Sequence, residues 1–272
     1  MKVPTSVSAF DNIVGGGVPS GSVIILAGEP GAGNREFSYT SAAKLSLARK
    51  DKHFREFMIE DSPDIYIPEG TTYISFSRSE KEVMHAVDLT FNPDLASSFR
   101  DNLVFKDFSI EYFKNSIVPT RWVTQNIGEF LKRKGDLLKE FVEFIDNNAD
   151  RKIVIVDSLT DLVTSPRIEV NNLIDVIRGL RRKAKEWNTV IYLLLTIGVL
   201  DKKMENILFD SVDGVMVFEW HASLRYSKRY RYMYVLKFTG LMAQLEEERI
   251  ARFNTTLNRR NGFVVVNTEK IG

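Results

Sequence analysis

The chain has 272 residues, of which 44% are hydrophobic and 11% are aromatic, which is enough for a large folded core. Lysine and arginine number 37 and aspartate and glutamate 36, so no bulk charge attracts the chain to nucleic acid or to a membrane surface. The absence of cysteine excludes disulfides, thiolate metal ligands and cysteine nucleophiles, and the three histidines lack the spacing of a zinc site.

Short β-branched runs alternate along the chain with longer amphipathic runs, a pattern typical of a parallel sheet with crossover helices. Val23–Ala27 is apolar throughout, as in a strand buried on both faces, and a helix is expected at Arg35–Arg49 after a glycine-rich turn. Later strands are predicted at Thr72–Phe76, Leu103–Phe105, Lys152–Val156, Thr189–Leu195, Gly214–Glu219 and Tyr230–Phe238. The clearest later helices are Ile127–Asn147 and Val170–Trp187.

The last two apolar runs, Arg249–Phe253 and Phe263–Val266, are separated by a turn that contains Asn261-Gly262, a β-hairpin signal. Two stretches, residues 50–70 and 107–121, mix aromatic and charged residues with proline. We interpret them as insertions into a single domain that spans residues 1–272, because no repeat, low-complexity tract or linker divides the chain.

The first residues lack the basic-then-apolar layout of a signal peptide, and the longest apolar run, Val190–Leu195, is far too short to span a membrane. We therefore expect a cytoplasmic protein without a membrane partner. The charged, cysteine-free composition is one that would suit a thermophile.

A glycine-rich segment near the start carries the main functional signal. A turn, Gly15-Gly16-Gly17-Val18-Pro19-Ser20-Gly21, leads into the first core strand, which is followed by Gly28-Glu29-Pro30-Gly31-Ala32-Gly33-Asn34-Arg35. Glycines permit positive φ angles, so that consecutive N–H groups can surround an anion. The turn, strand and loop at this spacing resemble the start of the RecA/KaiC-like P-loop ATPases, including the archaeal RadA relatives. We call residues 28–35 the phosphate loop.

The resemblance extends over most of the chain. Asp157 and Ser158 follow an apolar run that resembles the Walker B strand, whose aspartate helps to hold magnesium in the family. Tyr73–Phe76 resembles the strand that delivers the catalytic glutamate, and Ser211–Val215 and Arg231–Gly240 resemble two late family segments. The resemblance implies an α/β fold: a RecA-like, mostly parallel, twisted sheet flanked by helices, with a C-terminal β-hairpin extension. It is closest to small archaeal KaiC-like proteins, a group that has degenerate members.

The phosphate loop departs from the family pattern G-x-x-x-x-G-K-[ST] at its two most important positions. Asn34 stands where the family has the lysine that contacts phosphate, and Arg35 stands where it has the hydroxyl that binds magnesium. Arginine cannot ligate a cation, and its charge repels one. Because the positions of Arg35 and Asp157 normally share one magnesium ion, we expect these two side chains to contact each other.

Two further family features are altered. Ser77 and Arg78 occupy the position of the glutamate that polarises the attacking water, and neither accepts a proton at neutral pH. In the segment that would reach the γ-phosphate in a neighbouring subunit, Arg231 and Lys237 remain but Thr239 replaces an arginine.

The sequence therefore predicts a pseudo-ATPase, without catalytic residues, metal or cofactor, that acts as a binding, assembly or regulatory protein. The resemblance implies self-association or pairing with an active RecA/KaiC-like paralogue. The phosphate-loop face and the predicted strand Tyr230–Phe238, taken as a sheet edge, are the candidate interfaces.

Two alternatives remain at this stage. In the first, Arg35 replaces the family lysine and the loop binds nucleotide or phosphate weakly without magnesium. In the second, interleaved aromatic and basic side chains bind single-stranded nucleic acid by stacking and charge. The residues of this second alternative are Arg225, Tyr226, Lys228, Arg229 and Tyr230.

Overall fold

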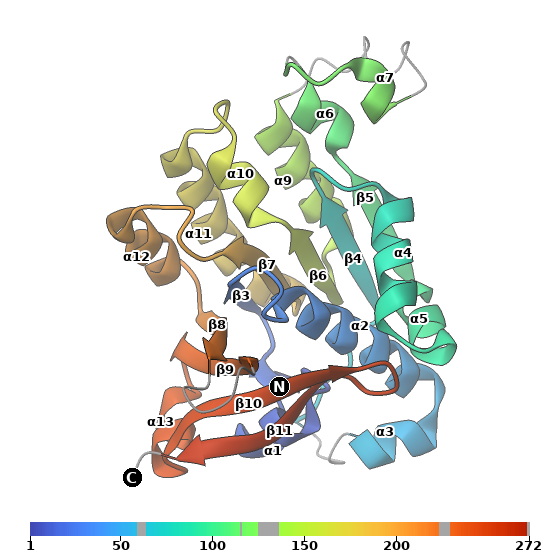
Figure 1. Cartoon of the computed structure of the whole chain (residues 1–272), viewed down its shortest axis with the longest axis vertical. Coiled ribbons are helices and arrows are strands. Elements are labelled where there is room, and N and C mark those ends of the chain that lie inside the picture. Colours follow the sequence, from blue (N-terminus) through green and yellow to red (C-terminus); the bar gives the residue numbers. More distant parts are fainter. Residues whose placement is uncertain (59–63, 115, 125–135, 223–228, 271–272) are drawn as a thin grey trace.

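The computed structural model describes residues 1–58, 64–114, 116–124, 136–222 and 229–270 (Figure 1). Its centre is a nine-stranded sheet with the order β11-β10-β9-β8-β3-β7-β6-β4-β5. The strands are β3 (Ser22–Gly28), β4 (Gly70–Ser75), β5 (Leu103–Asp107), β6 (Lys152–Asp157), β7 (Val190–Thr196), β8 (Gly214–Ala222), β9 (Arg229–Phe238), β10 (Ile250–Asn258) and β11 (Gly262–Lys270). A separate antiparallel pair joins β1 (Lys2–Val3) to β2 (Val18–Pro19).

The sheet is parallel from β8 through β3, β7, β6 and β4 to β5, and β9, β10 and β11 continue it in antiparallel pairing. The prediction of a mostly parallel sheet with a C-terminal hairpin is confirmed. Parallel strands end at the same edge of the sheet, so the loops after β3, β4, β6 and β7 lie together there.

Helices cover both faces of the sheet (Figure 1). They are α1 (Ser8–Ile13), α2 (Asn34–Lys50), α3 (Lys52–Met58), α4 (Glu80–Thr90), α5 (Pro93–Arg100), α6 (Ser109–Phe113), α7 (Thr120–Val123), α9 (Leu137–Asn148), α10 (Leu159–Thr164), α11 (Val170–Trp187), α12 (Lys202–Asp210) and α13 (Met242–Glu247).

Strand β3 is buried on both faces, as its apolar run predicts. Ile24 and Leu26 belong to a core that also holds side chains of α1, α2, α4 and α5. Val23, Ile25 and Ala27 point the other way, into a core shared with α9, α10, α11 and α12. The period-two alternation of strand side chains thus divides one continuous apolar run between two cores.

Several predicted boundaries are corrected. Helix α11 has the predicted bounds, but α9 begins only at Leu137, and residues 127–135 of the predicted longer helix lie outside the described residues. The strands of the C-terminal hairpin are longer than predicted.

The interpretation of Tyr230–Phe238 as a sheet edge is wrong for the first half of β9. Arg231, Tyr232 and Met233 pair with β8 on one side and with β10 on the other. The hairpin that follows β9 covers this part of the strand, which therefore cannot serve as an open edge for another subunit.

The two predicted insertions contain α3 and α6, which lie at opposite ends of the long axis in Figure 1. No helix in the described ranges combines the length and the apolar character needed to cross a membrane.

Candidate functional site

The phosphate loop joins the end of β3 to the start of α2 at the carboxyl edge of the parallel strands. Gly31 and Gly33 have φ angles of +77° and +113°, in the left-handed region that favours glycine. A Cβ atom at Gly33 would lie 2.9 Å from the ring of Phe263 on β11. At position 33, glycine is required both by the backbone conformation and by the close approach of the C-terminal hairpin.

Asn34 turns its amide back onto the protein's own backbone. Its Nδ2 donates to the carbonyl oxygen of Leu26 at 3.1 Å, and its Oδ1 accepts from the backbone N–H of Arg35 at 3.0 Å. The side chain lies so close to Gly28 that a Cβ atom there would be 2.8 Å from Asn34 Cγ. The residue at the family's lysine position therefore stabilises the loop and brings no positive charge into the site.

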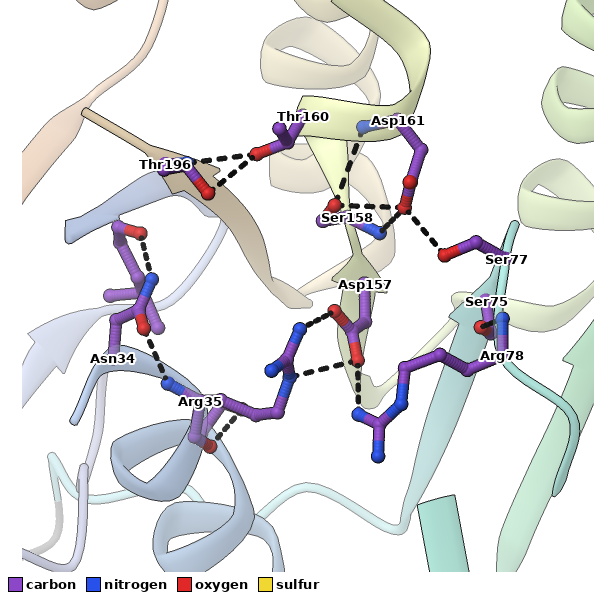
Figure 2. A network of polar contacts seen from close by, with 12 residues as sticks. Asn34, Arg35, Ser75, Ser77, Arg78, Asp157, Ser158, Thr160, Asp161 and Thr196 are labelled. Carbon is purple, nitrogen blue, oxygen red and sulfur yellow. Dashed lines mark hydrogen bonds and ion pairs between the residues drawn. The ribbon is translucent and has the colours of Figure 1, made fainter. Parts of the chain in front are cut away.

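Arg35 forms a bidentate ion pair with Asp157, and the predicted contact between these two side chains is present (Figure 2). Nε donates to Oδ2 at 3.1 Å and Nη2 donates to Oδ1 at 2.8 Å, the planar geometry that arginine and carboxylate favour. The Asp157 side chain is 2% exposed and that of Arg35 is 41% exposed. Burial opposes the positive charge of Arg35, but Asp157 outweighs this effect and holds the pKa of Arg35 above its usual value.

Arg78 and two buried tyrosines complete the surroundings of Asp157. Arg78 Nη1 donates to Asp157 Oδ2 at 3.2 Å and to the Tyr39 hydroxyl at 3.2 Å. The Tyr73 hydroxyl donates to the same carboxylate oxygen and lies 3.2 Å from the Tyr39 hydroxyl. Burial, and then the negative charge of Asp157, raise the pKa of Tyr73 well above its usual value, so it remains a neutral donor. Figure 2 shows the two guanidinium groups reaching Asp157 from opposite sides.

The magnesium ion that the fold implies does not fit these residues. Both oxygens of Asp157 accept hydrogen bonds from guanidinium groups, and the second guanidinium leaves one net positive charge around this carboxylate. The described residues also contain no group of three or more histidine, cysteine, aspartate or glutamate side chains that could hold a metal ion.

Ser77, at the family's glutamate position, has a structural contact. Its hydroxyl donates to Asp161 Oδ2 at 3.3 Å, beside the backbone N–H and hydroxyl of Ser158, which donate to the same oxygen at 3.1 and 2.9 Å. Ser158 and Asp161 form the capping box that starts α10. Burial raises the pKa of Asp161 in spite of these bonds.

A cavity of about 210 Å³ lies between the phosphate loop and the ends of β6 and β7. It is smaller than the roughly 300–1,000 Å³ of most pockets for organic ligands. Its lining consists of Gly28, Glu29, Pro30, Gly31, Asn34, Arg35, Ser158, Thr160, Leu194, Leu195 and Thr196. The space suits a small oxyanion better than a complete nucleotide.

Strands β8 and β9 hold the phosphate loop through side-chain and backbone hydrogen bonds, a feature that the sequence did not reveal. The backbone N–H of Trp220 donates to Glu29 Oε2 at 2.8 Å, and its indole Nε1 donates to the Pro30 carbonyl oxygen at 3.2 Å. Arg231 Nε donates to the Gly31 carbonyl oxygen at 3.1 Å, and its guanidinium lies 4.2 Å from the centre of the Trp220 ring. We call Trp220 and Arg231, which hold the loop from β8 and β9, the loop clamp.

The remaining predicted contact residues lie apart from this cluster. Lys237 donates to the carbonyl oxygens of Phe209 and Asp210 at 3.2 and 2.9 Å, and so caps the end of α12. Arg229 and Tyr230 are exposed on β9. The other residues of the nucleic-acid alternative, Arg225, Tyr226 and Lys228, lie outside the described residues, and that alternative stays a prediction.

Comparison with known proteins identifies the fold. No protein-family model and no curated protein sequence matches the chain. A solved structure of a KaiC-like protein from the hyperthermophilic archaeon Pyrococcus horikoshii OT3 aligns with a TM-score of 0.61 and 16% identity, over 98% of this chain and 99% of that one. The flagellar accessory protein FlaH from Methanocaldococcus jannaschii aligns with a TM-score of 0.57 and 16% identity, over 96% of each chain. The chain has the RecA/KaiC-like fold.

Proposed function

We propose that this chain is a RecA/KaiC-like pseudo-ATPase that acts as a binding, assembly or regulatory protein. The observation that supports this most strongly is the Arg35–Asp157 ion pair. A guanidinium of the protein itself neutralises the carboxylate that would hold magnesium, at the position where the family has a metal-binding hydroxyl. A nucleotide would have to break this pair to bring a metal ion to Asp157.

The chemistry of the other substituted positions supports the same conclusion. A catalytic general base contributes about 10²–10⁴-fold to a rate, and here its position holds Ser77 and Arg78. An arginine that acts on a neighbouring γ-phosphate contributes about 10³–10⁵-fold, and here its position holds Thr239. Even when these losses are not additive, little turnover remains.

The test combines phosphate release with calorimetric titration of ATP and ADP, in the presence and absence of magnesium. We expect no magnesium-dependent binding and no phosphate release. The matched variant is Asn34→Lys combined with Arg35→Thr, which restores the phosphate loop but leaves Ser77 and Arg78 in place. It should gain magnesium-dependent binding without turnover. Magnesium-dependent hydrolysis by the unmodified chain, abolished by Asp157→Asn, would overturn the proposal.

A second candidate function is metal-free binding of a small oxyanion. The 210 Å³ cavity and the half-exposed Arg35 side chain beside it favour this activity. Inorganic phosphate and pyrophosphate, titrated with a chelator present, should bind weakly to the unmodified chain and not to Arg35→Met. Binding that is unchanged in Arg35→Met would remove this candidate.

For the partner, we propose a second copy of this chain or an active paralogue, engaged through the phosphate-loop face. Sedimentation velocity over a wide concentration range tests self-association. A monomer at every concentration, alone and with such a paralogue, would contradict it.

A further inference from the structure

A second cavity, of about 340 Å³, lies under the C-terminal hairpin, between α1, α2 and β11. Its lining consists of Val7, Ser8, Ala9, Lys44, Asn261, Phe263, Val264 and Val265. Ala9 and Asn261 are exposed, whereas Val7, Lys44, Phe263 and Val265 are buried. The cavity therefore has an accessible rim and a mainly apolar interior, and its lining includes one positively charged side chain, that of Lys44.

The walls of this cavity are fixed by hydrogen bonds. The Thr40 hydroxyl on α2 accepts from the backbone N–H of Phe263 on β11 at 2.8 Å. The hairpin turn is bound to the start of α5 by the Asn92 N–H, which donates to the Arg259 carbonyl oxygen at 2.7 Å. Lys44 lies one helical turn after Thr40, on the same face of α2. The hairpin is thus bound to α2, the helix that carries the lysine.

Lys44 is 8% exposed, which is rare for a lysine. In the described part of the chain, its ammonium donates to the Ser6 carbonyl oxygen at 3.3 Å, a long hydrogen bond for a group with three donors. Burial lowers the pKa of Lys44 to about 8, while Asp11 opposes this change, so the ammonium remains mainly charged at pH 7.

Asp11 is the nearby carboxylate, and its oxygens are already engaged. They accept hydrogen bonds from the backbone N–H groups of Thr5 and Ser6 at 2.9 and 2.7 Å, and from the Thr5 hydroxyl at 2.7 Å. Burial raises the pKa of Asp11 to about 7, so its negative charge is incomplete at neutral pH. Lys44, which lines the cavity, therefore retains donor capacity and positive charge.

We propose that this cavity binds a small organic carboxylate, whose anionic group accepts hydrogen bonds from Lys44 and whose apolar part packs against Val7, Phe263 and Val265. The volume corresponds to about eleven waters at liquid density, which suits a compact acid with a branched or aromatic body. One lysine matches a single negative charge, and the apolar walls disfavour a multiply charged phosphate ester. The proposal does not depend on the proposed function of the phosphate loop.

The test uses benzoate and isobutyrate as probes, with benzamide as the neutral counterpart of benzoate. Amide resonances of the full chain are followed by NMR at pH 7 during titration to about 10 mM. We expect the two acids to shift resonances of residues 7–9 and 261–265 with dissociation constants of about 1 mM, and benzamide to bind at least about tenfold more weakly.

Three variants make the result specific. Lys44→Met keeps the length of the side chain, removes its charge and should weaken benzoate binding at least about tenfold. Ala9→Phe places a large side chain at the exposed rim of the cavity and should block the entry of benzoate, while Lys44 is unchanged. Lys203→Met, on the exposed surface of α12, should bind benzoate as the unmodified chain does. Absence of shifts with both acids, or equal binding of benzoate by Lys44→Met, would overturn the proposal.

Discussion

Removal of the Arg35 guanidinium should destabilise the fold by an amount that the structure predicts. Arg35→Met keeps much of the aliphatic stem and leaves the buried carboxylate of Asp157 with Arg78 and Tyr73 as its donors. Loss of one partner from a buried ion pair costs about 3–5 kcal/mol. The surviving donors and the 41% exposure of the Arg35 side chain reduce this to about 2 kcal/mol. For a chain of this size, we expect Tm to fall by about 4–8 °C.

A double-mutant cycle with Arg35→Met and Asp157→Asn isolates the interaction free energy of this ion pair. The free energy of unfolding of each variant is measured by urea titration, with far-UV circular dichroism as the probe. We expect a coupling energy of about 1.5–2 kcal/mol. The matched control is Arg100 with Asp88, whose atoms are 2.7 Å apart but whose side chains are 38% and 52% exposed. This control pair should couple by less than about 1 kcal/mol. If the coupling at Arg35 and Asp157 is no larger than in the control, the ion pair does not hold the site together.

Three further changes test other parts of the structure. Trp220→Ala removes half of the loop clamp, and we expect hydrogen exchange of phosphate-loop amides to rise by about tenfold; unchanged exchange would contradict the clamp. Gly262→Ala places a methyl group against Thr40 at a φ of +68°, and should lower Tm more than Gly198→Ala, where the φ is +81° but the surrounding space is open. Burial raises the folded pKa of Asp11 to about 7 from an ordinary value of 3.8, so the stability it contributes is complete below about pH 4 and lost as pH rises to 7. Tm of the unmodified chain should therefore fall relative to Asp11→Asn across that window, and a constant difference would refute this.

The central contact of the candidate site could be predicted from the sequence, whereas its surroundings could not. The sequence predicts the contact between Arg35 and Asp157 because their positions share one magnesium ion in the proteins that the chain resembles, and must therefore lie close together. Tyr73 donates to Asp157 because β4 lies beside β6, with Ser75 opposite Asp157 in register. Strand order is a tertiary property, and no local pattern around Tyr73 identifies β6 as its neighbour.

The same reason explains the incorrect part of the fold prediction. Alternating and continuous apolar runs indicate where strands form, and the core strands agree with the structure within a few residues. The pattern within β9 does not show that β10 returns to pair with Arg231–Met233 and covers what would otherwise be an edge. The close approach of Phe263 to Gly33 depends on that return as well, because β11 lies beside the phosphate loop only when the hairpin extends the sheet.

The two cavities differ in how completely the protein satisfies its own charges. At the phosphate loop, Asp157 is neutralised by side chains of the same chain, and the loop is fastened by Asn34 and by Trp220. A ligand stabilises a protein only by binding the folded state more tightly than the unfolded one, and here it would first have to displace contacts that the folded state already makes. At Lys44, the long bond to Ser6 leaves donors that a carboxylate can engage without breaking an ion pair. Ligand-dependent stabilisation of this chain is therefore expected under the hairpin rather than at the phosphate loop.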